Sequence, residues 1–158
     1  MSAPVLDVTA GPRMMWFDPA DARAVYVDER RETVTLCDGR IITIEPDVQA
    51  DFRSLPFPDA TFHHVVFDPP HMERVGKTSW TRAKYGALFP TWRDDLAGGF
   101  AECFRVLKPG GTLIFKWNEY QIPVSEVLSC TPHKPLYGHR SGKQSKTHWI
   151  AFLKEVVE

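Results

Sequence analysis

Four short, largely apolar segments in the first half of the 158-residue chain each run into an aspartate. The segments end at Asp7, Asp28, Asp51 and Asp68. Short apolar runs of this kind are typical of strands buried in a parallel sheet. Because the carboxyl ends of parallel strands meet at one edge of an open α/β sheet, where such folds bind ligands, we expect the four carboxylates to face a common ligand.

The fourth segment ends in the turn Asp68-Pro69-Pro70-His71. Proline cannot continue a central strand, and Pro70 fixes the backbone so that the Pro69 carbonyl projects beside the Asp68 carboxylate. Two acceptors at one point can take both hydrogens of an amino group on an aromatic ring, which localises the lone pair on nitrogen. The turn therefore indicates chemistry on an amine, and the plain alternative is a strand that ends in aspartate and a proline stop.

The earlier strand ends suggest a nucleotide-like ligand. Asp28 is placed to accept both hydroxyls of a ribose. Asp51 can accept from the amino group of an adenine while the N–H of Phe52 donates to the ring. The turn between Thr9 and Gly11 would bring backbone amides close to the same ligand. Because this turn has one glycine in place of G-x-G-x-x-G, NAD and a nucleotide-binding oxidoreductase are disfavoured.

Length and composition restrict the class of protein. We expect one domain over residues 1–158, with no separate target-recognition domain. Three distant cysteines fit a reducing, cytoplasmic compartment, and neither they nor the histidines have the spacing of a metal site. The sequence has no apolar stretch of membrane-spanning length and no leader, so we expect neither a membrane segment nor a signal peptide.

The remaining elements follow from periodicity and turn residues. Alternating β-branched residues around Asp38-Gly39 predict a hairpin near 33–44, where a doubly wound fold normally has a crossover helix. Helical spacing predicts a helix capped by Thr91 and ending at 108–111, then a strand over 112–117. We also expect a poor or short helix over 14–24, a short one over 122–130, and a hairpin of strands at 135–138 and 147–153.

Basic residues gather in two loops, although the formal net charge of the chain is only -1. The irregular stretch 72–90 and the loop 139–146 contain the candidate substrate-binding residues Lys77, Trp80, Lys84, Tyr85, Arg140, Lys143 and Lys146. Cations suit phosphates and rings suit unstacked bases, so these loops favour a nucleic-acid partner. The alternative is a pair of solvated basic loops.

The order of these motifs, together with Arg105-Val106-Leu107-Lys108-Pro109-Gly110-Gly111, resembles class I S-adenosylmethionine-dependent methyltransferases over roughly residues 4–118. Within that superfamily, the Asp-Pro-Pro-x turn resembles the amino-methyltransferases of DNA and RNA bases. The resemblance implies a Rossmann-like three-layer α/β sandwich, mostly parallel, with a terminal antiparallel hairpin. His71 stands where the base-modifying families usually carry Tyr, Phe or Trp, and the first turn lacks their usual run of glycines.

The resemblance also implies a site. The turn from Asp7 through Thr9 to Gly11 would hold the methionine part of S-adenosylmethionine, Asp28 its ribose, and Asp51 with Phe52 its adenine. Asp68 and the Pro69 carbonyl would hold the target amine, and Asp68 would also contact the cofactor. The catalytic turn would include Pro70 and His71, and a base that leaves the stack would meet the His71 ring, whose charge we expect to change near neutral pH.

The predicted reaction is a direct, metal-free methyl transfer to an exocyclic amino group, with adenine N6 in DNA or RNA as the principal target. A small-molecule or protein methyltransferase, a non-catalytic partner subunit and a homo-oligomer stay open as alternatives.

Overall fold

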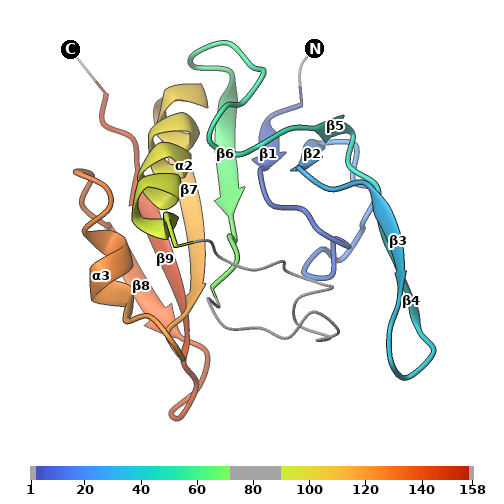
Figure 1. The fold of residues 1–158 in the computed structure, drawn as a ribbon. Coiled ribbons are helices and arrows are strands. Elements are labelled where there is room, and N and C mark those ends of the chain that lie inside the picture. Colours follow the sequence, from blue (N-terminus) through green and yellow to red (C-terminus); the bar gives the residue numbers. More distant parts are fainter. Residues whose placement is uncertain (1–2, 72–89, 157–158) are drawn as a thin grey trace.

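The structure, a computed structural model, describes residues 3–71 and 90–156 (Figure 1). A seven-stranded sheet has the order β5-β2-β1-β6-β7-β9-β8. Its strands are β1 (Val5–Asp7), β2 (Ala24–Asp28), β5 (Val48–Gln49), β6 (Phe62–Phe67), β7 (Leu107–Asn118), β8 (Tyr137–Arg140) and β9 (Thr147–Leu153). The strands β5, β2, β1, β6 and β7 pair in parallel with one another, whereas β9 is antiparallel to both β7 and β8. The predicted mixed sheet with a terminal antiparallel hairpin is confirmed.

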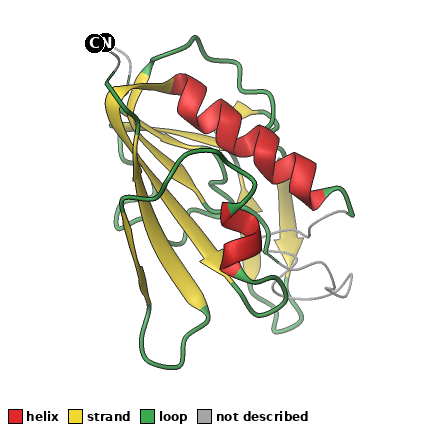
Figure 2. Ribbon diagram, turned by 90° about the vertical axis from the view of Figure 1, so that its left-hand side faces the viewer, coloured by secondary structure: helices red, strands yellow, loops and turns green. Residues whose placement is uncertain are grey.

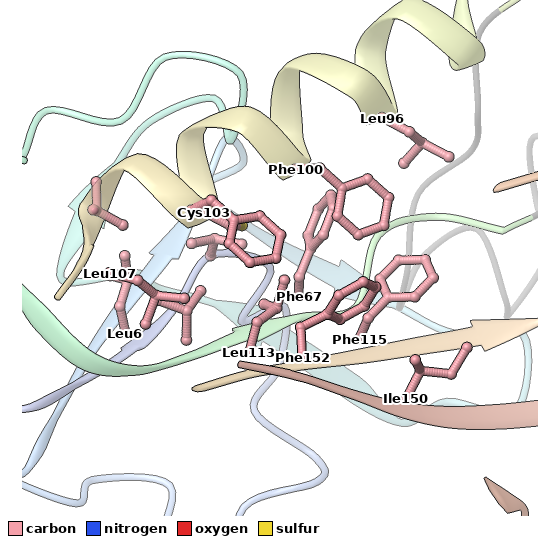
Figure 3. Packing of buried hydrophobic residues seen from close by; sticks show 14 of the residues in the cluster. Leu6, Phe67, Leu96, Phe100, Cys103, Leu107, Leu113, Phe115, Ile150 and Phe152 are labelled. Carbon is pink, nitrogen blue, oxygen red and sulfur yellow. The ribbon is translucent and has the colours of Figure 1, made fainter. Parts of the chain in front are cut away.

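One face of this sheet carries the main core. Helices α2 (Trp92–Val106) and α3 (Val124–Leu128) both lie on that side (Figure 2). The Phe100 ring of α2 packs edge-on against Phe67, with centroids 5.3 Å apart, and lies 4.8 Å from Phe115 (Figure 3). Cys103 is fully buried in the same cluster, as predicted for a core residue without chemistry, and burial raises the pKa of its thiol far above the usual range.

A separate two-stranded sheet projects from the side of the molecule where β2 and β5 lie, away from β8 (Figure 1). It consists of β3 (Glu32–Thr35) and β4 (Ile41–Ile44), which pair antiparallel as predicted. Gly39 turns the chain in the left-handed region, with φ of 87°, and its N–H donates to the Leu36 carbonyl at 2.9 Å. The hairpin buries a small core of its own between Leu36, Ile42 and Ile44.

Two features of α2 differ from the prediction. Thr91 makes no side-chain cap to the helix backbone, because its hydroxyl donates instead to the Asp95 carboxylate at 3.0 Å. The helix ends at Val106, and β7 already begins at Leu107, five residues before the predicted strand. The backbone of Lys154 stabilises this extension, because its carbonyl accepts from Gly110 and its N–H donates to Gly111.

The segment between β1 and β2 also differs from the sequence prediction. Residues 14–23 form turns and bends rather than even a short helix, Ala24 already begins β2, and Arg13 takes a left-handed φ of 59°. Pro19 within the segment cannot donate to a helical ladder, which favours this irregular path. In the part of the chain that the structure describes, no helix is long and apolar enough to cross a membrane, and no group of three potential ligands could hold a metal ion.

Candidate functional site

A cavity opens at the carboxyl edge of the parallel strands. Segments that follow β1, β2, β5 and β6 line it, together with Lys116 of β7. The lining residues are Val8, Thr9, Ala10, Gly11, Pro12, Met14, Met15, Asp28, Glu29, Arg30, Ala50, Phe52, Asp68, Pro70 and Lys116. Five of the predicted cofactor residues, Thr9, Gly11, Asp28, Phe52 and Asp68, therefore meet in one place.

The first turn is tied to the end of β2. The Gly11 N–H donates to Asp28 Oδ2 at 2.9 Å, and the Arg30 Nε donates to Asp28 Oδ1 at 3.1 Å. Gly11 has φ of 51°, in the left-handed region that glycine adopts without strain. One glycine thus suffices to bring this turn against the Asp28 carboxylate.

Asp7 lies beneath the cavity rather than in its wall. Its side chain is buried and accepts from the Thr9 N–H at 3.1 Å and from the Trp16 Nε1 at 2.7 Å. Burial raises the pKa of Asp7 to about 7, against the lowering effect of these hydrogen bonds, and the nearby Asp68 and Asp28 raise it further. Asp7 therefore supports the first turn from below.

Asp68 stands where β6 ends. Its N–H donates to the Thr9 hydroxyl at 2.7 Å, which joins the Asp-Pro-Pro turn to the first turn. Lys116 Nζ lies 3.6 Å from Asp68 Oδ2. Burial raises the pKa of Asp68 to about 6, and Lys116 acts in the opposite direction. Sequence reasoning missed Lys116, although a lysine inside the apolar strand of residues 112–117 was a signal that could have revealed it.

The other residues of the Asp-Pro-Pro-His turn differ in their position relative to the cavity. Pro70 lines the cavity, whereas neither Pro69 nor His71 is among the described lining residues. The His71 ring lies edge-on to Trp117, with centroids 6.2 Å apart. Burial, with a smaller effect of Lys116, lowers the pKa of His71 to about 4. Our expectation that its charge changes near neutral pH is therefore wrong, because the imidazole is neutral there.

The third strand end contributes a ring rather than a carboxylate. Phe52 lines the cavity and packs against Phe67, with centroids 5.1 Å apart. Asp51 accepts from Arg53 at 2.6 Å, and Arg53 also donates to Asp95 at 2.8 Å. A role of Asp51 toward adenine stays a prediction. Glu29, which sequence reasoning missed, does line the cavity, and burial raises its pKa.

The predicted basic residues are only partly described. Arg140 and Lys143 line a second hollow, at the loop between β8 and β9, whereas Lys146 is exposed beside it. Lys77, Trp80, Lys84 and Tyr85 lie outside the described residues.

Solved structures share this architecture, although no protein-family model and no curated protein matches the sequence. A Pyrococcus horikoshii OT3 protein has a TM-score of 0.61 and 17% identity, covering 96% of this chain and 81% of that one. The Burkholderia thailandensis 1,6-didemethyltoxoflavin-N1-methyltransferase, solved with bound 1,6-didemethyltoxoflavin and S-adenosylhomocysteine, has a TM-score of 0.57 and 14% identity, covering 96% of this chain and 71% of that one. The chain therefore shares the fold of S-adenosylmethionine-dependent methyltransferases of known structure.

The same fold also supports other chemistry. The cyclase SpnF has a TM-score of 0.53 and 12% identity to this chain, covering 97% of it and 74% of its own length. Function has to be argued from the site, because related folds carry different reactions.

Proposed function

We propose that this protein transfers a methyl group from S-adenosylmethionine to an exocyclic amino group of a nucleic-acid base, adenine N6 in the first place. The observation that carries the proposal is the position of Asp68, which lines the same cavity as Thr9, Gly11 and Asp28. A carboxylate that can hold an amine thus stands beside a site with the residues of a nucleoside pocket.

The cavity suits this cofactor. Asp28 and Glu29 are carboxylates at the tip of β2 and can accept from ribose hydroxyls. The Phe52 ring and Ala50 offer an apolar wall to the adenine. Asp68, with Asp7 beneath, provides the negative charge that a sulfonium favours. When bound, S-adenosylmethionine supplies an electrophilic methyl group.

The protein's own groups would position the amine and receive its proton. One oxygen of Asp68 faces Lys116, while the carboxylate retains further lone pairs for an incoming N–H. The Pro69 carbonyl would accept the second N–H, which favours the pyramidal nitrogen of the attacking state. As the new N–C bond formed and the bond between the methyl carbon and the sulfonium sulfur broke, leaving a neutral thioether, the nitrogen would become cationic and lose a proton. With its pKa raised by burial to about 6, Asp68 is basic enough to take that proton transiently.

The substrate side of the proposal rests on charge. Arg140, Lys143 and Lys146 stand at the β8–β9 loop, and we propose that they contact phosphates. Lys77, Trp80, Lys84 and Tyr85 would add cations and stacking rings from the other basic loop. We further propose that residues 1–158 act as one catalytic domain, with any target recognition supplied by these loops or by a partner subunit.

Methyl transfer from tritiated S-adenosylmethionine tests this function directly. The purified protein should label DNA or RNA, and Asp68→Ala should lower the rate roughly 10²-fold or more, the loss expected for one preorganised electrostatic partner. Calorimetry should find that the variant still binds S-adenosylhomocysteine with nearly unchanged affinity, because this neutral thioether does not depend on the charge of Asp68. Asp38→Ala, at the turn of the β3–β4 hairpin and away from the cavity, is the matched control and should retain full activity. Full methyl transfer by Asp68→Ala would refute the assignment.

A small-molecule methyltransferase is the second candidate. The structural neighbour from Burkholderia thailandensis is named for methylation of a ring nitrogen in 1,6-didemethyltoxoflavin, a small heterocycle. Offering a cell lysate as acceptor separates the two readings, because label would then appear in the metabolite fraction instead of nucleic acid. If calorimetry shows no cofactor binding by the wild-type protein, a non-catalytic partner subunit becomes the better reading.

A further inference from the structure

A second hollow lies at the loop that joins β8 and β9. It is lined by Gly138, His139, Arg140, Gly142, Lys143 and His148. The polar side chains of this set are two histidines, one arginine and one lysine, and none of them is an acid. The two glycines add no side chain, which leaves room between the cationic groups.

The loop holds these groups on a fixed backbone. Ser141 N–H donates to the Thr147 carbonyl at 3.0 Å, and Gly142 N–H donates to the Arg140 carbonyl at 2.9 Å. Gly142 turns the chain with φ of 99°. The Trp149 indole then donates to the Ser141 hydroxyl at 2.8 Å. The hollow is therefore a preorganised concavity rather than a set of cations on a loose tail.

The charge of this region is largely uncompensated. The sequence contains no acid between Val127 and Lys154. Glu119, at the carboxyl end of β7, contacts one member of the set, with its carboxylate 2.9 Å from His148 Nε2. Arg140 and Lys143 have no salt bridge among the described residues, although Glu119 is near enough that its pKa is lowered mainly by the His148 hydrogen bond and slightly by the charge of Arg140. An anion with several acceptor oxygens fits such a set, and a phosphate is the common biological group of that kind.

A row of side chains on one face of the sheet connects His139 of the hollow to Asp68, whereas Arg140 and His148, which pair in register with each other, start from the opposite face. Lys116 contacts Asp68 and pairs in register with Trp149 on β9, and Trp149 pairs in register with His139 on β8. The Lys116 ammonium lies 5.1 Å from the centroid of the Trp149 ring. Three strand spacings of about 4.8 Å separate β6 from β8, so the hollow lies on the order of 14 Å from Asp68. That is farther than a base amine lies from the phosphate of its own nucleotide.

We propose that this hollow binds a backbone phosphate of the substrate strand, one or two nucleotides away from the base that Asp68 receives. The inference rests on the proposed function and deepens it, because it assigns one anchoring site of the strand and its distance from the target base. The row from Lys116 through Trp149 would lie beneath the intervening nucleotide.

The test compares two double variants that remove the same charge. The first variant, Arg140→Gln with Lys143→Gln, replaces the arginine and the lysine of the hollow by neutral amides. Arg40→Gln with Lys108→Gln is the control, because Arg40 lies at the tip of the β3–β4 hairpin and Lys108 at the amino end of β7. The probes are fluorescent single-stranded DNA and RNA of about 15 nucleotides, read by anisotropy over a salt series. Adenosine monophosphate serves as the short competitor.

The hollow variant should bind both strands at least about tenfold more weakly, and its log–log salt slope should fall by about 0.7 for a single phosphate contact. The control should keep wild-type affinity, and adenosine monophosphate should compete equally with both. Two outcomes would overturn the phosphate site. One is an equal loss of strand affinity in the two double variants, and the other is wild-type strand affinity in the hollow variant. Calorimetry with S-adenosylmethionine on the same samples keeps the questions apart, because a lack of cofactor binding refutes the proposed function alone.

Discussion

Lys116 affects whether the Asp68 carboxyl is ionised when the substrate binds. Its ammonium lies 3.6 Å from Asp68 Oδ2, on the neighbouring strand. Burial raises the pKa of Asp68 to about 6, and Lys116 holds it below the value that burial alone would produce. Only the ionised carboxylate is purely an acceptor, whereas a protonated one presents an O–H toward the amine. We infer that Lys116 is a positioning residue that keeps Asp68 ionised.

Replacing Lys116 should therefore move a pH profile. Methyl transfer by wild type should fall as the pH drops through about 6, where Asp68 gains its proton. Lys116→Met removes the stabilising cation, so the pKa of Asp68 rises and the acid limb should shift to higher pH. Activity measured between pH 5.5 and 8.5 should show a larger loss at the acid end, and Lys116→Arg should restore the profile.

Lys108→Met is the matched control, since it removes a lysine from the opposite end of the same strand. An unchanged acid limb in Lys116→Met would show that Asp68 does not depend on this contact.

Helix α2 supports the cavity through a glycine pair whose members differ in their surroundings. A methyl group at Gly98 would meet only the Arg53 side chain, at 3.6 Å, which is ordinary contact. A methyl group at Gly99 would lie 2.7 Å from Phe67 Cζ and 2.8 Å from Phe52 Cδ1. Because Phe52 lines the cavity, the close packing of Gly99 links the helix to the site.

The two alanine substitutions should have opposite effects. Gly98→Ala should stabilise the protein by up to about 1 kcal/mol, since alanine favours a helix interior. Gly99→Ala should destabilise it by roughly 1–3 kcal/mol, the range for overpacking a core, and should also weaken cofactor binding as Phe52 shifts. Urea denaturation measures the first effect and calorimetry the second. Equal stability of the two variants would contradict the packing seen here.

Local patterns were enough to predict most elements. The apolar runs indicated the parallel strands, Asp38-Gly39 indicated the hairpin, and the helical period indicated α2. The start of β7 could not be predicted, because its first residues are held by hydrogen bonds from Lys154, more than forty positions away. Long-range pairing of this kind leaves no local signal.

The same limit applies to the site. Strand ends identified Asp28 and Asp68 because topology alone brings them to one edge. The ion pair of Arg53 with Asp95 could not be predicted, since the two residues lie forty-two positions apart. Met14 and Met15 reach the cavity from an irregular segment, which has no periodicity from which its path could be inferred.

At the scale of the whole molecule, a formal net charge of -1 conceals a division of charge along the active edge. Carboxylates gather in and beneath the cavity, at Asp7, Asp28, Glu29 and Asp68. The cations of Arg140 and Lys143 lie beyond β9. A cationic cofactor and a polyanionic substrate would thus be drawn to adjacent but different parts of one edge.

This separation of charge predicts that the relative affinity for S-adenosylmethionine and S-adenosylhomocysteine depends on pH. Burial raises the pKa of Asp68 to about 6 and that of Asp7 to about 7, so both carboxyls gain charge between pH 5.5 and 7.5. The sulfonium of S-adenosylmethionine is cationic, whereas S-adenosylhomocysteine has a neutral thioether. The affinity ratio in favour of S-adenosylmethionine should therefore rise with pH over this range.

Calorimetry in buffers of different ionisation enthalpy should also show protons released when S-adenosylmethionine binds near pH 6.5, and fewer with S-adenosylhomocysteine. Asp68→Asn should reduce that release. A ratio independent of pH would mean that neither carboxyl senses the sulfonium.

The β3–β4 hairpin has a consequence for how this fold can be altered. It occupies the connection between β2 and β5, yet those strands still pair in parallel, with Val27 opposite Val48. Its apolar side chains pack among themselves, at Leu36, Ile42 and Ile44. Lengthening a surface connection has a small entropic cost, which grows slowly with loop length. The Asp38-Gly39 turn is therefore a site at which another domain could be inserted into the chain without changing the register of the main sheet.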